Sequence, residues 1–375
     1  MNKRQQMLQR MLRALLPVVI LSGIIIGSLG ISRAQIKAGT DHNFAKARVT
    51  AILSDYSDNT PFNGSQQVRA VLTSGTWKGQ EVELANSNSY QQGALCQVGT
   101  RVIALVQQGS DGTVSGCVYN YDRTGMVYLL LALFFLSLVA VGGRKGIATI
   151  YALGFTFACV IFLYLPLLYV GMNGVLAAAL TSVVILTVSI YILNGWSRKS
   201  LCSMAGTTAG VCISGVLAMV LGGLGHLNGF HASDAEAMVF IANSTRLNVG
   251  QLLYSGILIS SLGAVMDVSV SVAAAIEEIH EKAPKLPVRE LFRSGMHIGH
   301  DMIGTMSNTL ILAYTGSATG ALLTLYSYEM PYLQVMGYNS IVIEILCGLC
   351  GTIGVILTVP IQAAITAFAL RGQAR

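Results

Sequence analysis

Residues 260–275 read SSLGAVMDVSVSVAAA, a small and apolar run that holds one carboxylate, Asp267. The run lies inside a longer apolar segment, 250–276, which is long enough to cross a bilayer as a helix rising about 1.5 Å per residue. A carboxylate at that depth is costly because hydrocarbon offers no water to solvate it, and protein usually holds it. The stretch therefore indicates a membrane helix with a candidate functional residue in its middle.

The composition of the whole chain agrees with a membrane location. Its 375 residues are 53% hydrophobic and only 11% charged, whereas a water-soluble domain is about a quarter charged. The chain also has 40 glycines, and small residues are typical of membrane helices that approach one another closely. The composition predicts a polytopic α-helical membrane protein.

Apolar spans define the predicted helices. They fall at about 125–142, 147–166, 174–193, 202–224, 250–276, 299–325 and 340–370. These seven form a predicted membrane domain, 125–371, and an N-terminal apolar run brings the count to about eight transmembrane helices. Residues 287–296, PVRELFRSGM, mix charged and apolar residues and predict a separate amphipathic helix on the membrane surface.

The loop charges predict the orientation. If the N-terminus is cytoplasmic, the loops and termini on that side collect fourteen Lys or Arg. Apart from the segment between the first two helices, the opposite side holds only Arg246. The positive-inside rule then predicts a multi-pass protein with both termini in the cytoplasm. Residues 1–34 form a basic cytoplasmic N-terminus and an anchor helix, and a signal peptide cleaved after Ala34 is the open alternative.

The segment 45–121 has a different character. Five alternating stretches are separated by Gly, Asn, Asp and Ser clusters, at 47–53, 67–73, 80–84, 101–107 and 113–119. This pattern predicts strands and turns, and hence a small extracytoplasmic all-β domain, an OB-like barrel between helices one and two. Residues 41–123 hold six Lys or Arg against seven Asp or Glu, and few aromatics. The balance argues against nucleic-acid binding and favours a module for packing or for docking of a partner.

Helical spacing and depth group polar residues around Asp267. The small residues on its stripe predict that Asp267 faces other helices of the bundle. Counting along the neighbouring spans puts Asn308 and Gln362 at a similar depth. A stripe through Asn308 extends as a polar track towards the cytoplasmic edge. The predicted ion-coupling set is Asp267, Asn308, Gln362, Asp301 and Thr305, with Glu344 and Ser271 as secondary candidates.

Two interpretations of Asp267 are open. In the functional one, it binds and releases a proton or a sodium ion, and Asn308 tunes its pKa. In the structural one, a protonated Asp267 donates a hydrogen bond to Asn308 or to a backbone carbonyl. The functional interpretation is preferred, because an ionisable residue inside a membrane segment is a functional hypothesis by default.

Other chemistry is weakly signalled. His297 and His300 would need further ligands to hold a metal, so neither a metal nor a cofactor is predicted. The sequence has no catalytic triad, phosphate loop or zinc-protease pattern, and an enzyme is not expected. Cys96 and Cys117 lie in the β segment, and a disulfide between them is open if that segment is in an oxidising compartment.

Two stretches carry a family resemblance. Residues 263–284, GAVMDVSVSVAAAIEEIHEKAP, and 291–317, LFRSGMHIGHDMIGTMSNTLILAYTGS, resemble the core of the YibE/F-like family of bacterial membrane proteins. The β segment, with GQEVELANS at 79–87 and VGTRVIALV at 98–106, resembles the YibE-type member. The resemblance implies a bacterial plasma-membrane location and a second YibE/F-family membrane protein as a partner.

A more local resemblance is to the SecD/SecF and RND-type permease core, where a helix aspartate takes part in proton- or sodium-driven energy coupling. Asp267 matches that aspartate, and Asn308-Thr309 matches the polar pair on the following helix. The chain departs from the pattern at Val268-Ser269. The expected function is an ion-coupled transporter or transporter subunit that uses Asp267. The alternative is a non-transporting scaffold or assembly protein whose β domain docks an extracytoplasmic partner.

Overall fold

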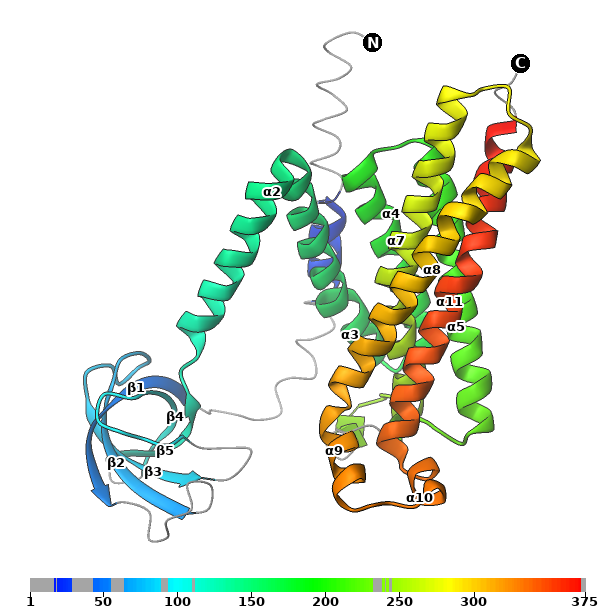
Figure 1. Ribbon diagram of the computed structural model, residues 1–375. Helices are drawn as coiled ribbons and strands as arrows, with labels where there is room; N and C mark the ends of the chain where they lie inside the picture. The colour runs from blue at the N-terminus through cyan, green and yellow to red at the C-terminus, as the bar shows by residue number, and fades with distance from the viewer. Residues whose placement is uncertain are drawn as a thin grey trace, which may run out of the picture. The chain divides into compact units, whose positions relative to one another are not determined.

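The computed structural model describes residues 17, 19–28, 43–54, 64–88, 94–109, 112–231, 238–239, 241–242 and 245–371. It divides into two compact units, residues 36–141 and residues 1–35 with 142–375. Figure 1 shows a β-barrel in the first unit and a helical bundle in the second.

Five strands in the described ranges form the barrel, closed in the order β1-β2-β3-β5-β4. They are β1 (Asn43–Ser54), β2 (Gly64–Leu72), β3 (Glu81–Asn88), β4 (Arg101–Gln108) and β5 (Val114–Tyr121). Neighbouring strands are antiparallel except β3 and β5, which run parallel. Each alternating stretch of the sequence overlaps one of these strands, so the predicted strands are confirmed.

The alternation builds the barrel core. In β2, Val68, Ala70 and Leu72 are buried, while the residues between them are more exposed. Two buried amides tie the segment before β4 to the barrel: Asn86 Nδ2 donates to the carbonyl of Ala94 (2.5 Å), and Gln66 Nε2 donates to that of Cys96 (3.1 Å). Because each buried amide has a partner, the polar groups do not weaken the apolar core.

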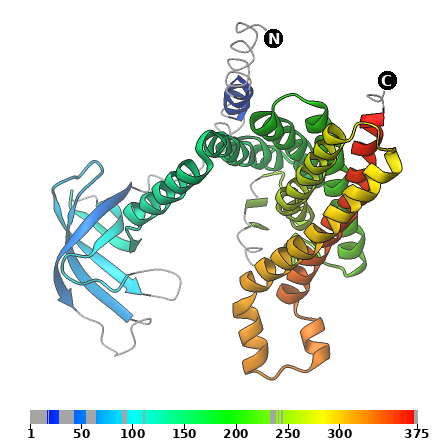
Figure 2. The ribbon, with the colours of Figure 1, turned by 45° about the horizontal axis from the view of Figure 1, so that its top comes forward.

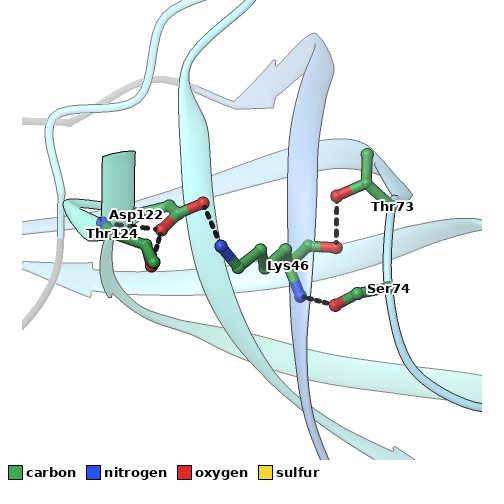
Figure 3. Close-up of polar contacts among 5 residues, drawn as sticks. All are labelled: Lys46, Thr73, Ser74, Asp122 and Thr124. Atoms are coloured by element: carbon green, nitrogen blue, oxygen red, sulfur yellow. Dashed lines mark hydrogen bonds and ion pairs between the residues drawn. The ribbon is translucent and has the colours of Figure 1, made fainter. Parts of the chain in front are cut away.

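A polar cluster joins the barrel to the first long helix, α2 (Thr124–Cys159). Lys46 Nζ on β1 lies 3.2 Å from Asp122 Oδ2 (Figure 3). Asp122 Oδ1 accepts hydrogen bonds from the backbone N–H and the hydroxyl of Thr124. On the other side, the Lys46 N–H donates to Ser74 Oγ (2.8 Å) and the Lys46 carbonyl accepts from Thr73 Oγ1 (3.1 Å). Asp122 therefore satisfies a free N–H at the start of α2 while it holds β1.

From Thr124 onward the chain is mostly helical. After α2 come a π-helical turn (Val160–Tyr164), α3 (Leu165–Tyr169), α4 (Gly174–Asn194), α5 (Arg198–Leu224), two short 3-10 turns (Gly229–His231 and Val249–Gln251), α7 (Leu252–Lys282), α8 (Val288–Ser317), α9 (Thr319–Ser327), α10 (Tyr332–Met336) and α11 (Asn339–Leu370). Asn173 and Ser197 cap α4 and α5 with side-chain oxygens, which explains where these two helices begin.

By length and composition, five helical segments of the described residues are apolar enough to cross a membrane, or six if the bent pair α8–α9 counts as one span. The predicted spans 125–142 and 147–166 both fall in the first of these, Thr124–Tyr169, whose backbone is non-helical at Gly143 (φ 52°, ψ −128°). The anchor is described only as the shorter apolar helix Val19–Ser28, and the cleavage site after Ala34 lies outside the described residues. The count of eight helices stays a prediction.

Three helices, α5, α7 and α11, form the centre of the bundle, with α4 packed on α5 and α7, and α8 packed on α7 and α11. Figure 2 shows α8 and α11 running side by side. The buried face of α7 carries Val265, Val268 and Val272, which share one apolar cluster with Val355 and Val359 of α11. Close packing of these β-branched side chains sets which face of α7 is turned inward.

The amphipathic stretch predicted at 287–296 is helical, but it does not form a separate helix. α8 runs without interruption from Val288 to Ser317, so the amphipathic stretch is its first part. Leu291, Gly295 and Gly299 are its buried residues, and a Cβ on either glycine would overlap Ile276 or Val359. The charged residues of the stretch occupy the opposite side. Glycine contact with α7 and α11 therefore continues the helix through a region that its charges alone would assign to the membrane surface.

The far end of α8 is broken. α9 leaves α8 at 62°, so the predicted span 299–325 is a bent pair. Beyond it, the chain turns at Glu329 (φ 47°) into α10. This end carries the highly exposed side chains of Tyr326, Tyr328 and Tyr332. Tyrosines gather at membrane–water interfaces, so this end of the bundle has the character of an interfacial belt.

Candidate functional site

Asp267 is the central residue of α7, fifteen positions from Leu252 and fifteen from Lys282. Its side chain is exposed, whereas Val268 and Ser269 beside it are buried. Among the described residues, no ion pair or hydrogen bond engages its carboxylate. The structure therefore confirms the mid-helix position and leaves the carboxylate without a partner among the residues that it describes.

The orientation predicted for Asp267 is corrected by the structure. Its stripe of small and polar residues is exposed at Ser260, Gly263, Asp267 and Ser271. The opposite face of α7, rich in valine, packs into the bundle instead. Small residues are compatible with either face of a membrane helix, and the bulkier valines decide the matter because they fill more core volume.

α8 lies next to the exposed stripe of α7. Tyr314 Oη on α8 donates to Ser260 Oγ on α7 (2.8 Å), and Ile276 of α7 lies against Gly295 of α8. These two pairs make the helices antiparallel. Interpolation between the two pairs puts Asp267 level with about residue 305 of α8.

The α8 candidates share that level and exposure. Thr305, Asn308 and Asp301 are all exposed, and the Thr305 hydroxyl donates to the carbonyl of Met302 (3.1 Å). Ser307 beside them has a buried hydroxyl oxygen without a hydrogen-bond partner among the described residues. The stripe of α7 and this stretch of α8 together form a polar face, called here the α7–α8 face. It is defined by Ser260, Gly263, Asp267, Ser271, Asp301, Thr305 and Asn308.

Gln362 does not belong to the α7–α8 face. It is completely buried on α11, where its Oε1 accepts from Ser269 Oγ (2.6 Å) and its Nε2 donates to Thr366 Oγ1 (2.8 Å). Ser269 Oγ also lies 3.0 Å from the carbonyl oxygen of Ser203 on α5. The structure thus divides the predicted site in two, with Asp267 on the exposed side of α7 and Gln362 bonded to its buried side.

A seam of small residues surrounds Gln362. A Cβ at Gly206 would overlap Gln362 Oε1, and one at Gly210 would overlap Thr358 Oγ1. The same close approach recurs one turn further, where a Cβ at Gly354 would overlap Ser214 Oγ. Repeated contacts every four residues let α5 and α11 pack backbone to backbone. Gly206 is therefore a close-packing position of α5.

Several buried hydroxyls of the helical bundle were missed by sequence reasoning. Ser203 Oγ on α5 and Thr181 Oγ1, Ser182 Oγ and Ser189 Oγ on α4 are buried without a hydrogen-bond partner among the described residues. Serine and threonine in an apolar span look like ordinary small residues, so their burial becomes apparent only from the packing of the helices. The only sequence signal is their recurrence on neighbouring spans.

Glu344 lies near the beginning of α11, away from Asp267, and lines a cavity between α8 and α11. His297 and His300 are exposed on α8. Within the described residues, no group of three His, Cys, Asp or Glu side chains is arranged to hold a metal ion. Cys96 and Cys117 are free thiols, so the disulfide left open by the sequence is not formed in this structure. Burial raises the pKa of the Cys96 thiol to about 11.

Comparison with protein families shows to which family the chain belongs. The family model described as YibE/F-like protein matches residues 130–372. The chain belongs to the YibE/F-like family. The matched range contains Asp267, Asn308 and Gln362, and strands β1 to β5 all precede it. No curated protein and no solved structure matches this YibE/F-like protein. The likeness to the SecD/SecF core therefore rests on the residues alone.

Family membership and the apolar helices together identify a membrane protein. In this YibE/F-like protein, the central carboxylate of α7 is exposed on a polar face, and the buried amide of Gln362 stabilises the core. These two environments suit different tasks, since a buried amide with two partners is rigid and an unpaired carboxylate is able to exchange an ion.

Proposed function

We propose that this YibE/F-like protein is the membrane subunit of a proton- or sodium-coupled transporter, without catalytic chemistry of its own. Asp267 is the carboxylate that binds the coupling ion. The observation that carries the proposal is the exposed carboxylate at the centre of α7, which has no partner in the described part of the chain and lies on a face of small and polar residues. A purely structural aspartate would be expected to have a hydrogen-bond partner within the chain.

The α7–α8 face gives the coupling step a physical basis. A bare carboxylate facing hydrocarbon is unfavourable, so Asp267 needs a proton, a cation, water or a covering protein. Asn308 and Thr305 lie at about its level and add amide and hydroxyl oxygens, the ligands that a hard cation prefers. Asp301 precedes Thr305 on α8 and extends the acidic character towards the loop between α7 and α8, which contains Lys285. A second YibE/F-family membrane protein that covers this face would exclude lipid from the site.

We also propose an orientation of the protein in the membrane. Both termini lie in the cytoplasm of a bacterium, the barrel lies outside the plasma membrane, and the basic residues of the short loops support this arrangement. Movement of the ion between Asp267 and either side would then be coupled to transport of the substrate.

The test is thermal unfolding of the purified full-length protein across pH and sodium concentration. Wild type should show a sodium- or pH-dependent shift that Asp267→Asn lacks, because the amide neither binds a proton in this range nor carries charge. Glu278→Gln is the matched control, since Glu278 is an exposed carboxylate at the end of the same helix, paired with Lys282. If wild type and Asp267→Asn respond identically, the coupling role is lost. If Asp267→Asn fails to accumulate, Asp267 is structural.

A second candidate function is a non-transporting scaffold whose OB-like barrel docks an extracytoplasmic partner. It is favoured by an exposed edge-to-face aromatic pair on the barrel, Phe44 and Tyr119, whose ring centroids are 5.4 Å apart. Exposed aromatic side chains are common anchors of protein interfaces. The strand order, with β3 parallel to β5, supports the OB likeness. Under this function, replacing both Phe44 and Tyr119 with alanine abolishes docking of the extracytoplasmic partner, and Asp267→Asn does not.

A further inference from the structure

A cavity of about 260 Å³ lies between α8, α9 and α11, and its lining includes neither Asp267 nor Gln362. Its walls are mostly apolar and include Ile311 of α8, Leu322 of α9, and Ile345 and Leu349 of α11. It forms where α9 bends away from α8 by 62°. The break between the two helices therefore opens a space that a straight span would fill with its own side chains.

One carboxylate interrupts the apolar lining. Glu344 is the only Asp, Glu, Lys, Arg or His among the residues that line this cavity. Within the described part of the chain, no Lys, Arg or His forms an ion pair with it. A carboxylate against an apolar wall favours a cation that brings its own apolar surface, because a small hydrated ion would lose its water there.

An aromatic ring lies in the same lining. Tyr314 contributes to the cavity wall, and its hydroxyl donates to Ser260 Oγ at 2.8 Å, which holds the ring in position. Aromatic faces attract ammonium groups by cation–π interaction. Thr315, also in the lining, adds a hydroxyl whose proton is already donated to the carbonyl of Ile311 (2.8 Å). The polar groups that remain available in the cavity are acceptors or π faces, so they suit a cation.

The depth of the cavity fits a lipid-like ligand. Glu344 lies five residues after Asn339, the first residue of α11, or about 7.5 Å along the helix axis. The exposed tyrosines Tyr326, Tyr328 and Tyr332 precede α11 at this end of the bundle. Such residues mark the membrane–water interface, so the cavity lies just inside it. A headgroup amine at the interface would reach Glu344 while its chain follows Ile345 and Leu349.

We propose that this cavity binds the ammonium group of an amphiphile, with Glu344 as the counter-charge and Tyr314 as the aromatic wall. The same chemistry is offered by the ethanolamine headgroup of a membrane lipid and by a free single-chain ammonium amphiphile. The site is independent of ion coupling at Asp267.

Native mass spectrometry of the full-length protein in dodecyl maltoside micelles tests the site. One arm adds dioleoylphosphatidylethanolamine or dioleoylphosphatidylglycerol, which has no ammonium group. Wild type should bind the ethanolamine lipid roughly five- to tenfold more tightly, from one ion pair and one cation–π contact. The other arm adds dodecyltrimethylammonium, whose chain matches that of the neutral detergent, and measures displacement of the lipid.

Variants decide the outcome. Glu344→Gln should remove the preference with the fold intact, and Glu329→Gln, an exposed carboxylate at the same end of the bundle, should retain it. Ile345→Phe, which adds volume at a lining residue that is 44% exposed, should weaken binding of the ethanolamine lipid and of dodecyltrimethylammonium. Preference for the ethanolamine lipid identifies a lipid source, and Glu344-dependent binding of dodecyltrimethylammonium alone identifies a free amphiphile. Equal binding of both lipids without Glu344-dependent binding of dodecyltrimethylammonium, or a preference unchanged in Glu344→Gln, would overturn the proposal.

Discussion

Two glycines of this bundle have opposite surroundings. Gly206 lies in the closely packed core, and Gly263 lies on the exposed stripe of α7. A Cβ at Gly206 would overlap Gln362 Oε1 and lie 3.1 Å from Ser269 Oγ, whereas nothing lies within 4 Å of a Cβ at Gly263. Gly206→Ala should therefore destabilise the protein by about 1–3 kcal/mol through overpacking and disturbance of the Ser269–Gln362 hydrogen bond. The measurement is thermal or denaturant unfolding in detergent micelles.

Gly263→Ala is the matched control, because it introduces the same methyl group at the exposed stripe of α7. Alanine is a better helix former than glycine, so this variant should be neutral or slightly more stable. Equal destabilisation by the two substitutions would mean that the Gly206 seam is not closely packed in the protein.

The sequence alone identified Asp267 and Gln362 as polar residues inside membrane spans, but it did not predict which way their side chains point. Asp267 is conspicuous because a carboxylate in an apolar span is rare, and its depth follows from counting residues. The side of the bundle that Asp267 faces cannot be predicted by counting residues, since the valine face and the small-residue face of α7 each fit a helix–helix contact. Gln362 shows the same limit: its depth was expected, but its bond to Ser269 depends on which side of α7 meets α11.

At the scale of elements, Asp122 links a strand to a helix. Hydrogen bonds from Thr124 and the nearby Lys46 ammonium hold the pKa of the Asp122 carboxyl below its ordinary value of 3.8. A lowered pKa means that ionised Asp122 stabilises the fold fully above about pH 3.8, and that this contribution declines as the pH falls towards the folded-state value. Asp122→Asn should therefore cost about 1 kcal/mol near neutral pH and progressively less under acid conditions.

Trp77, which packs on the barrel core, reports unfolding of this unit by its fluorescence. Glu83→Gln provides the control. Its ion pair with Arg69 has both side chains largely exposed, so the loss should be close to zero at every pH. A difference between wild type and Asp122→Asn that does not shrink in acid would contradict the assigned role of the ionised carboxylate.

Strands were easier to predict than helix ends. Period-two alternation marks the inward residues of β2 and β4 directly, because a barrel has one buried and one exposed side. Helix boundaries in the membrane depend on what each turn touches. The first turns of α8 carry three charged residues and still belong to the long helix, since Leu291, Gly295 and Gly299 are buried in the bundle.

For the whole molecule, two native cysteines of the barrel test its location. Cys117 is exposed and Cys96 is buried, with a thiol pKa raised to about 11 by its apolar surroundings. If the barrel lies outside the cytoplasmic membrane, a membrane-impermeant maleimide added to intact spheroplasts should label Cys117. Cys96 should stay unlabelled at neutral pH, because little of it is thiolate there, and react only when the pH approaches 11 or the barrel unfolds.

Peptide mapping by mass spectrometry separates the two sites, and lysed membranes give the reference for complete access. Labelling of Cys117 only after lysis would reverse the proposed orientation. Labelling of Cys96 together with Cys117 at neutral pH would show instead that the barrel core is open in the cell.

The parallel pairing of β3 with β5 determines when the barrel is able to close during synthesis of the chain. β5 lies between β3 and β4, and it ends at Tyr121, three residues before α2 begins at Thr124. The ring cannot close until its last strand has emerged, so the free edges of β3 and β4 stay open to wrong pairing until that moment. The next segment to leave the ribosome is α2, a candidate membrane span. Closure of the barrel and delivery of α2 to the membrane are thereby neighbouring events in the life of each new chain.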